Sequence, residues 1–117
     1  MYDIRTTWKG VAQEAITMGM SVYLSAADLL IRRCDAVNTV CHGWALTSVA
    51  ALETVTIVTA CRMEVDTVQV PGRRAAVGAV GAGTAPSTTF AGTGITVGFG
   101  IAVDAIWLHV PQQAAEV

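Results

Sequence analysis

Few residues of this chain have the type and spacing that catalysis requires. The two histidines, His42 and His109, are far apart in the sequence, and each stands among apolar or glycine residues. General acid–base catalysis needs a titratable side chain with a partner that tunes its pKa. Neither histidine belongs to a recognisable pattern with such a partner. We therefore interpret both as structural residues and expect that the protein is not an enzyme.

Three other patterns are too incomplete to predict an active site. Ser87 lacks the GxSxG context of a nucleophile elbow. Residues 78–83 (GAVGAG) are glycine-rich like a phosphate-binding loop, but no GK[ST] ends them and no helical pattern follows. Glu64 and Asp66 stand two residues apart and share one face of a strand, which a solvated strand edge also explains. We predict no catalytic residue and no cofactor.

The three cysteines predict neither a disulfide framework nor a metal site. Cys34, Cys41 and Cys61 are odd in number and contain no CxxC spacing. A structural zinc ion needs four Cys or His ligands at paired short spacings, which these residues do not provide. We interpret the cysteines as small buried apolar residues, and we expect the chain to fold in a reducing compartment.

Arginine and tryptophan side chains are better candidates for a binding role. Arginine forms two-pronged hydrogen bonds with carboxylates, and tryptophan buries a large area at interfaces. Trp44 and Trp107 lie in expected strands and are assigned to the core, whereas Trp8 lies in a polar N-terminal stretch and is expected to dock on a partner. The candidate protein-interface residues are Trp8, Arg5, Arg32, Arg33, Arg73 and Arg74.

The composition also favours a protein partner over nucleic acid or a membrane. Hydrophobic residues make up 53% of the 117 residues and charged residues only 14%, against a usual charged fraction of about 25%. Such a chain folds rather than staying disordered. Seven Lys and Arg residues against nine Asp and Glu disfavour a phosphate backbone. The longest uncharged run, residues 75–103, is glycine-rich and contains Pro86, so we expect no transmembrane segment, and the N-terminus shows no signal peptide.

Short runs of β-branched residues broken by turn residues predict strands. Asp104 is expected to form the turn between the last two of them, and residues 71–90 are expected to be mostly loop, with at most a short strand near 76–80. A helix over residues 10–20 is a weaker alternative to extended structure there. The expected strands are 21–25 (SVYLS), 29–34 (LLIRRC), 43–48 (GWALTS), 53–60 (ETVTIVTA), 95–103 (ITVGFGIAV) and 105–110 (AIWLHV).

Strands at this spacing predict an all-β fold, namely a small antiparallel β-sandwich or barrel with a short N-terminal arm and Gly-rich loops. We assign residues 1–12 to the arm and residues 13–117 to a single β domain.

Several segments, taken in order, resemble the capsid decoration (cement) proteins of tailed bacteriophages. The likeness covers roughly residues 11–110, with Cys61 where glycine is common and Ala51-Leu52 in place of the usual Ala-Gly turn. The segments that carry it are 16–24 (ITMGMSVYL), similar to the family's ITAGxPVYL opening; 43–51 (GWALTSVAA), similar to GIALTSAAAGE; 53–60, similar to the strand xVxVVTxG; and 98–102 with 106–110, similar to the closing strand pair.

The resemblance implies a structural virion protein on the outer surface of an icosahedral capsid, folded in the host cytoplasm. Its partners would be the major capsid protein and further copies of itself, as a homotrimer or a dimer, and the arm with Trp8 would be a capsid-docking segment. Two alternatives stay open. One is a small β-barrel that binds a small molecule or carbohydrate through Trp44, Trp107 and Tyr23, and the other is an enzyme subunit that contributes little chemistry of its own.

Overall fold

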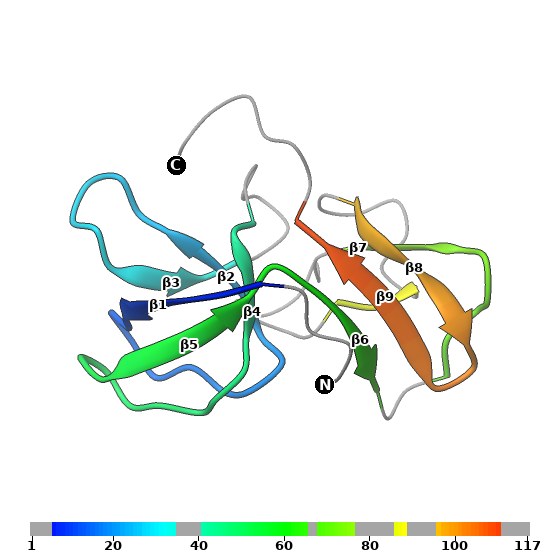
Figure 1. Cartoon of the computed structure of the whole chain (residues 1–117), viewed down its shortest axis with the longest axis horizontal. Coiled ribbons are helices and arrows are strands. Elements are labelled where there is room, and N and C mark those ends of the chain that lie inside the picture. The colour runs from blue at the N-terminus through cyan, green and yellow to red at the C-terminus, as the bar shows by residue number, and fades with distance from the viewer. Residues whose placement is uncertain (1–5, 35–40, 66–67, 77–85, 89–95, 111–117) are drawn as a thin grey trace.

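The protein is built from two antiparallel β-sheets that pack together as a small sandwich, not a closed barrel (Figure 1). The computed structural model describes residues 6–34, 41–65, 68–76, 86–88 and 96–110. Within these ranges there is no helix long and apolar enough to cross a membrane. The all-β class predicted from the sequence is confirmed. The strands are β1 (Thr7–Val11), β2 (Ser21–Leu24), β3 (Ile31–Arg33), β4 (Gly43–Ala45), β5 (Thr54–Val58), β6 (Ala60–Glu64), β7 (Arg74–Ala76), β8 (Thr96–Ala102) and β9 (Ala105–His109).

The first five strands form sheet one, in the order β1-β5-β4-β2-β3, and the last four form sheet two, in the order β6-β9-β8-β7. A single residue, Thr59, separates β5 from β6, so the chain passes directly from one sheet to the other. The N–H of Thr59 donates to the Thr6 carbonyl (3.0 Å), and its own carbonyl accepts from Val110 N–H (2.9 Å). Figure 1 shows the chain bending between β5, on the left, and β6, nearer the right, so that the two sheets lie side by side along the longest axis of the molecule, which measures 37 Å against 25 and 23 Å.

Two apolar clusters hold this arrangement together. One joins the sheets: Trp44 and Val58 of sheet one pack with Cys61, Ile106 and Leu108 of sheet two, all at most 1% exposed. Because burial of apolar area is the main driving force of folding, this cluster is what couples the two sheets.

The second cluster lies within sheet one and includes Val22, Val55 and Ile57. Sheet one curls around it, since a parallel bridge joins Ala12 to Ile31 and the N–H of Gln13 donates to the Ile31 carbonyl (2.9 Å). The edge strands β1 and β3 therefore approach each other at one point.

The region before β2 is extended rather than helical, so the helix alternative for residues 10–20 is wrong. Gly10 belongs to β1, and Ile16 forms an isolated antiparallel bridge with Val49. Part of the expected arm lies in the fold as well, because β1 is paired with β5 along its whole length. These residues gain hydrogen bonds and side-chain packing that a local sequence pattern does not reveal.

Two other boundaries differ from the expectation. The expected strand 29–34 is shorter, because Leu29 has a φ of 61° and β3 begins only at Ile31. The short strand expected near residues 76–80 is β7, which lies earlier, and residues 77–80 fall outside the described residues.

Candidate protein-binding surfaces

The residues examined for catalysis lie in separate parts of the molecule. His42 precedes β4 in sheet one, and its Nδ1 accepts a hydrogen bond from Leu24 N–H (2.8 Å). His109 is exposed at the end of β9 in sheet two, and Ser87 is buried with its hydroxyl donating to Gln69 Oε1 (3.2 Å). In the part of the chain that the structure describes, no three His, Cys, Asp or Glu residues gather as they would around a metal ion.

All three cysteines are buried, as the sequence predicted. Cys34, Cys41 and Cys61 belong to the cluster between the sheets. Burial raises the pKa of the Cys61 thiol to about 11, because the thiolate would lose its hydration there. A nucleophilic cysteine needs a lowered pKa and access to solvent, so Cys61 has the properties of a packing residue.

The first arginine doublet is held in ion pairs within the protein. Arg32 pairs with Asp28, and Arg33 pairs with Glu14 at 2.8 Å. The pKa of Asp28 is lowered because its carboxylate accepts a hydrogen bond from Leu30 N–H and lies beside the Arg32 guanidinium. These ion pairs hold the edge strand β3 against the β2–β3 turn and the segment before β2, which leaves the two arginines less available for an external carboxylate.

The second doublet differs from the first within the part of the chain that the structure describes. Arg73 and Arg74 are exposed, and Arg74 Nη1 donates to the neutral Thr96 hydroxyl (3.0 Å). Among the described residues, no carboxylate pairs with either of them. Of the candidate arginines, these two are the ones placed to meet a partner, and Arg5 lies outside the described residues.

Arg74 also stands at one end of a row of side chains that crosses the outer face of sheet two. The register pairs Arg62 of β6 with Trp107 of β9, Trp107 with Phe99 of β8, and Phe99 with Arg74 of β7. Directly opposed residues of antiparallel strands project from the same face. We call these four residues the arginine–aromatic row. Trp107 was expected in the core, but it is half-buried in this outer row, and Phe99 is 47% exposed.

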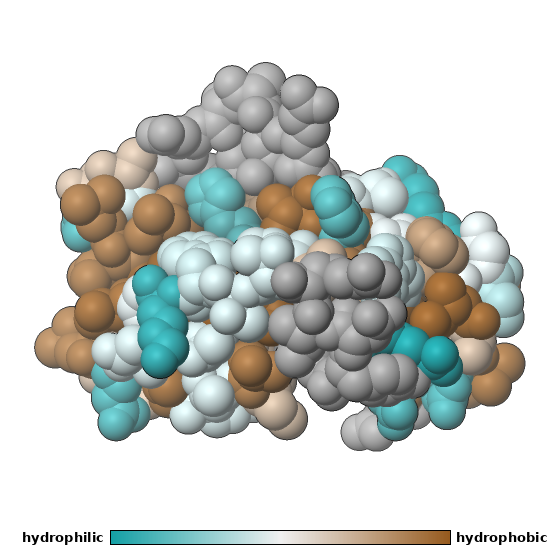
Figure 2. Space-filling view, viewed as in Figure 1, coloured by the Kyte–Doolittle hydropathy of each residue, from teal (hydrophilic) through white to brown (hydrophobic). Residues whose placement is uncertain are grey.

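Exposed apolar side chains also occur on β8, at the turn after it and on the chain that precedes β7, and we call them together with Phe99 the sheet-two patch. The chain just before β7 runs beside β8: Gln69 N–H donates to the Val103 carbonyl (2.8 Å) and Gly72 N–H to the Gly100 carbonyl (2.8 Å). Figure 2 shows hydrophobic surface next to hydrophilic surface at this right-hand end of the molecule. The patch consists of Val68, Val70, Phe99, Ile101 and Val103.

A buried glutamine fixes the two valines of the patch. Gln69 is 1% exposed, and its Oε1 accepts hydrogen bonds from Thr88 N–H (2.8 Å), Thr88 Oγ1 (3.1 Å) and the Ser87 hydroxyl. Thr88 Oγ1 in turn accepts from Val70 N–H (3.0 Å). Because Gln69 points inward, Val68 and Val70 on either side of it point outward. Residues 71–90 were expected to be loop, and nothing in their local pattern indicated this anchoring.

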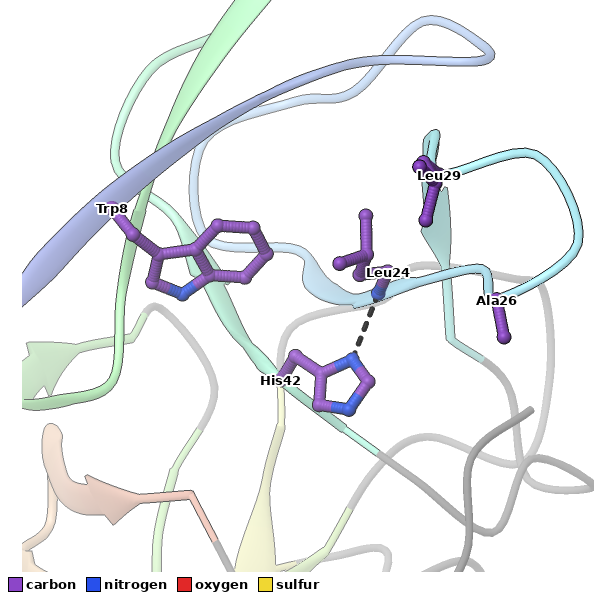
Figure 3. Close-up of a pocket in the computed structure, with 5 residues that line it drawn as sticks. All are labelled: Trp8, Leu24, Ala26, Leu29 and His42. Atoms are coloured by element: carbon purple, nitrogen blue, oxygen red, sulfur yellow. Dashed lines mark hydrogen bonds between the residues drawn. The ribbon is translucent and has the colours of Figure 1, made fainter.

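A second apolar surface lies at the opposite end of the long axis, in sheet one. A cavity of about 460 Å³, which we call the Trp8 pocket, is lined by Trp8, Leu24, Ala26, Leu29 and His42. In Figure 3 the Trp8 ring points toward Leu24, with His42 beside both. Trp8 is half-buried on β1, opposite Ile57, so it combines packing on sheet one with a place in the pocket wall.

Two leucines at this end have an unusual backbone conformation. Leu29 and Leu52 have φ values of 61° and 68°, and they are 70% and 73% exposed. The left-handed region costs an L-residue roughly 1 kcal/mol or more, and glycine or asparagine occupies it readily. In the decoration proteins that the sequence resembles, the corresponding turn is usually Ala-Gly, so Leu52 stands where the resemblance implies glycine. At these positions a leucine strains the backbone and gains no packing in the core. An exposed apolar side chain kept at such a cost is typical of a surface that contacts a partner.

The aromatic residues of the alternative barrel hypothesis do not line a common cavity. Trp44 is fully buried, and its Nε1–H donates to Ser21 Oγ (3.1 Å). Tyr23 packs against the same cluster, whereas Trp107 lies on the outer face of sheet two. That set of three residues is therefore wrong as a ligand site, because sheet two separates Trp107 from the other two.

Comparison with protein-family models finds no match, and a search of curated proteins finds none either. The similarity to phage decoration proteins thus stays a prediction from sequence motifs.

Proposed function

We propose that this protein is a capsid decoration protein that binds the outer surface of an icosahedral phage shell and bridges neighbouring subunits. The observation that carries the proposal is the presence of apolar surface at both ends of an elongated sandwich. Apart from the sheet-two patch, the exposed large hydrophobic residues of the described chain belong to β1 or to the connections between strands of sheet one, and we call them the sheet-one end: Val11, Met18, Leu29 and Leu52.

Exposed apolar patches on a folded protein mark interaction surfaces. A protein with one such surface can bind a partner, whereas surfaces at opposite ends allow it to join two. Figure 1 places the β2–β3 turn at the left end of the long axis and the β8–β9 turn at the right end. Leu29 belongs to the first turn and Val103 to the second, so contacts at both turns would link two partners across the 37 Å length.

The proposed assembly includes the major capsid protein and further copies of this chain, as a homotrimer. Each contact needs to be only modest, because linking several contacts in one oligomer raises the effective concentration of the remaining ones. Apolar faces buried between copies would also account for a surface with few charged residues.

A shell-binding assay tests the proposal. Purified undecorated shells are mixed with the protein, pelleted, and imaged by cryo-electron microscopy for occupancy and oligomeric state. We expect saturable density on the outer surface and shells that withstand a higher temperature. A stable monomer in solution that leaves the shells undecorated would overturn the proposal.

Variants at the two ends separate bridging from simple attachment. Ile101→Asp alters the sheet-two patch, and Leu29→Asp alters the sheet-one end. If the protein bridges subunits, each variant should lose the thermal protection of the shell, even where one remaining end still gives attachment. Ala15→Asp, at an exposed position outside the arm and outside both apolar surfaces, makes the same change from neutral to acidic and should leave protection unchanged.

The Trp8 pocket favours the alternative of a small-molecule or carbohydrate-binding module. Its wall combines an indole with an imidazole whose Nδ1 is already engaged by Leu24 N–H. Under that alternative, Trp8→Ala abolishes ligand binding by a monomer in calorimetry, and no capsid is needed. Under the decoration proposal, calorimetry of the wild-type protein with a series of sugars gives no binding heat, whereas the same protein binds shells.

A further inference from the structure

The arginine–aromatic row has dimensions that match an extended peptide. Neighbouring strands in a sheet lie about 4.8 Å apart, so the backbones of Arg62 and Arg74, three spacings apart, are separated by about 14 Å. An extended chain rises about 3.4 Å per residue, so residues i and i+4 are also about 14 Å apart and point to the same side. Residue i+2 of such a chain would then stand over the two aromatic side chains between the arginines.

The charges on this face specify the partner further. Arg74 and its neighbour Arg73 have no carboxylate partner in the described part of the chain, so the β7 end of the row is cationic. At the other end, Glu64 lies two residues from Arg62 on the same face of β6, and it offsets part of that charge. The protein as a whole carries a net charge of −2, so this cationic, aromatic face is a local departure from its overall balance. A partner segment that fits it is acidic, with its strongest contact at the β7 end.

We propose that the outer face of sheet two binds an extended acidic segment of a partner protein, with carboxylates about four residues apart and an apolar side chain midway between them. One carboxylate meets Arg74 and Arg73, the other meets Arg62, and the apolar side chain packs on Phe99 and Trp107. Arginine binds carboxylates with two parallel hydrogen bonds, and its guanidinium stacks on aromatic rings, so a row in which one arginine stands on each side of two aromatic residues is suited to this pattern. The inference deepens the proposed function, because it identifies the chemistry by which one end of the protein recognises the shell.

A peptide-binding experiment with the full chain tests the inference. The probe is a short fluorescent peptide with two glutamates four residues apart and a leucine midway, and the matched control peptide carries glutamines instead. We expect saturable binding of the glutamate peptide by fluorescence anisotropy, weakened by salt, and at least tenfold weaker binding of the control. Equal binding of the two peptides would overturn the inference.

Variants locate the site on the protein. Arg74→Gln and Phe99→Ala should each weaken peptide binding by about tenfold or more. Arg32→Gln makes the same chemical change at an arginine paired within sheet one, and it should leave peptide affinity unchanged. Because Phe99 and Arg74 are both exposed, we expect each variant to fold, and circular dichroism checks this. Unchanged affinity in both row variants would contradict the assignment, and so would tighter binding of single-stranded DNA or an oligosaccharide at the same face.

The same variants distinguish this inference from the decoration proposal. If wild-type protein coats the shells and Arg74→Gln and Phe99→Ala coat them equally well, the role of the row is refuted while decoration stands. If the glutamate peptide binds at the row but wild-type protein leaves shells bare, the row is supported and decoration is refuted.

Discussion

Replacing Leu52 with glycine is expected to stabilise the protein and, at the same time, to weaken its attachment to a shell. Leu52 has a φ of 68° and is 73% exposed, so its side chain contributes little packing in the isolated chain. Removing the left-handed strain of a non-glycine residue gains about 1 to 2 kcal/mol. The greater freedom of glycine in the unfolded chain costs about 0.4 to 1 kcal/mol. With the middle of each range, the net gain is about 0.8 kcal/mol.

Thermal unfolding measures this gain. The unfolding entropy is about 2.1 cal/mol/K per residue, so about 0.8 kcal/mol raises the Tm of this chain of 117 residues by about 3 °C. Leu52→Ala is the control, because alanine keeps a Cβ at the same φ and should not raise the Tm. Leu29→Gly should act in the same direction, since its φ is 61°.

Two results would refute this reasoning in different ways. A Tm that falls in Leu52→Gly, or that rises equally in Leu52→Ala, would show that backbone strain is not stored at this turn. A more stable Leu52→Gly protein that still protects shells as the wild type does would show that the leucine has no part in docking.

Three further predictions concern the packing that supports these surfaces. Gln69→Leu leaves the buried donors of Thr88 and Ser87 without their acceptor, and it should lower the free energy of unfolding by about 2 to 4 kcal/mol in urea denaturation. Gln13 is exposed, so the control Gln13→Leu should change this free energy little. Gly98→Ala places a Cβ against the Trp107 carbonyl and should destabilise the protein by about 3 kcal/mol or more, or prevent folding. The control Gly72→Ala has open space around the new Cβ but a φ of 83°, and it should cost only about 1 kcal/mol. Equal losses of stability in the two variants would argue against the close contact at Gly98. Cys61, with a pKa near 11, should resist alkylation at pH 8 until the protein unfolds in denaturant, and fast labelling of the native protein would contradict its burial.

The strands that could be predicted from the sequence are those formed by short runs of β-branched residues that turn residues separate. The run at residues 53–60 became β5, with Val55 and Ile57 inside, and Asp104 lies in the turn before β9. Strand β1 was not predictable in this way. Its sequence, TWKGV, is largely polar or exposed, and it is held by pairing with β5 more than 40 residues later.

The candidate interface was predictable by residue type but not by position. The two arginine doublets look alike in the sequence, yet Asp28 and Glu14 neutralise the first one and no described carboxylate neutralises the second. That difference depends on Glu14 lying beside Arg33 after folding, although 19 residues separate them. The aromatic part of the row is likewise a matter of register between strands, which local patterns do not specify.

The single residue between β5 and β6 has a mechanical consequence. If subunits held at the two ends are pulled apart, tension passes from sheet one to sheet two through the short connection between β5 and β6, where the chain bends (Figure 1). The hydrogen bonds from β5 to β1 and β4, and from β6 to β9, are perpendicular to the strands that they join. A load applied along these strands shears whole ladders, whose bonds must break together instead of opening one after another. Thr59 would then be the point where force passes from the β5 ladders to the β6 ladder. The two ends of the protein would therefore separate only at a force that breaks several hydrogen bonds at once.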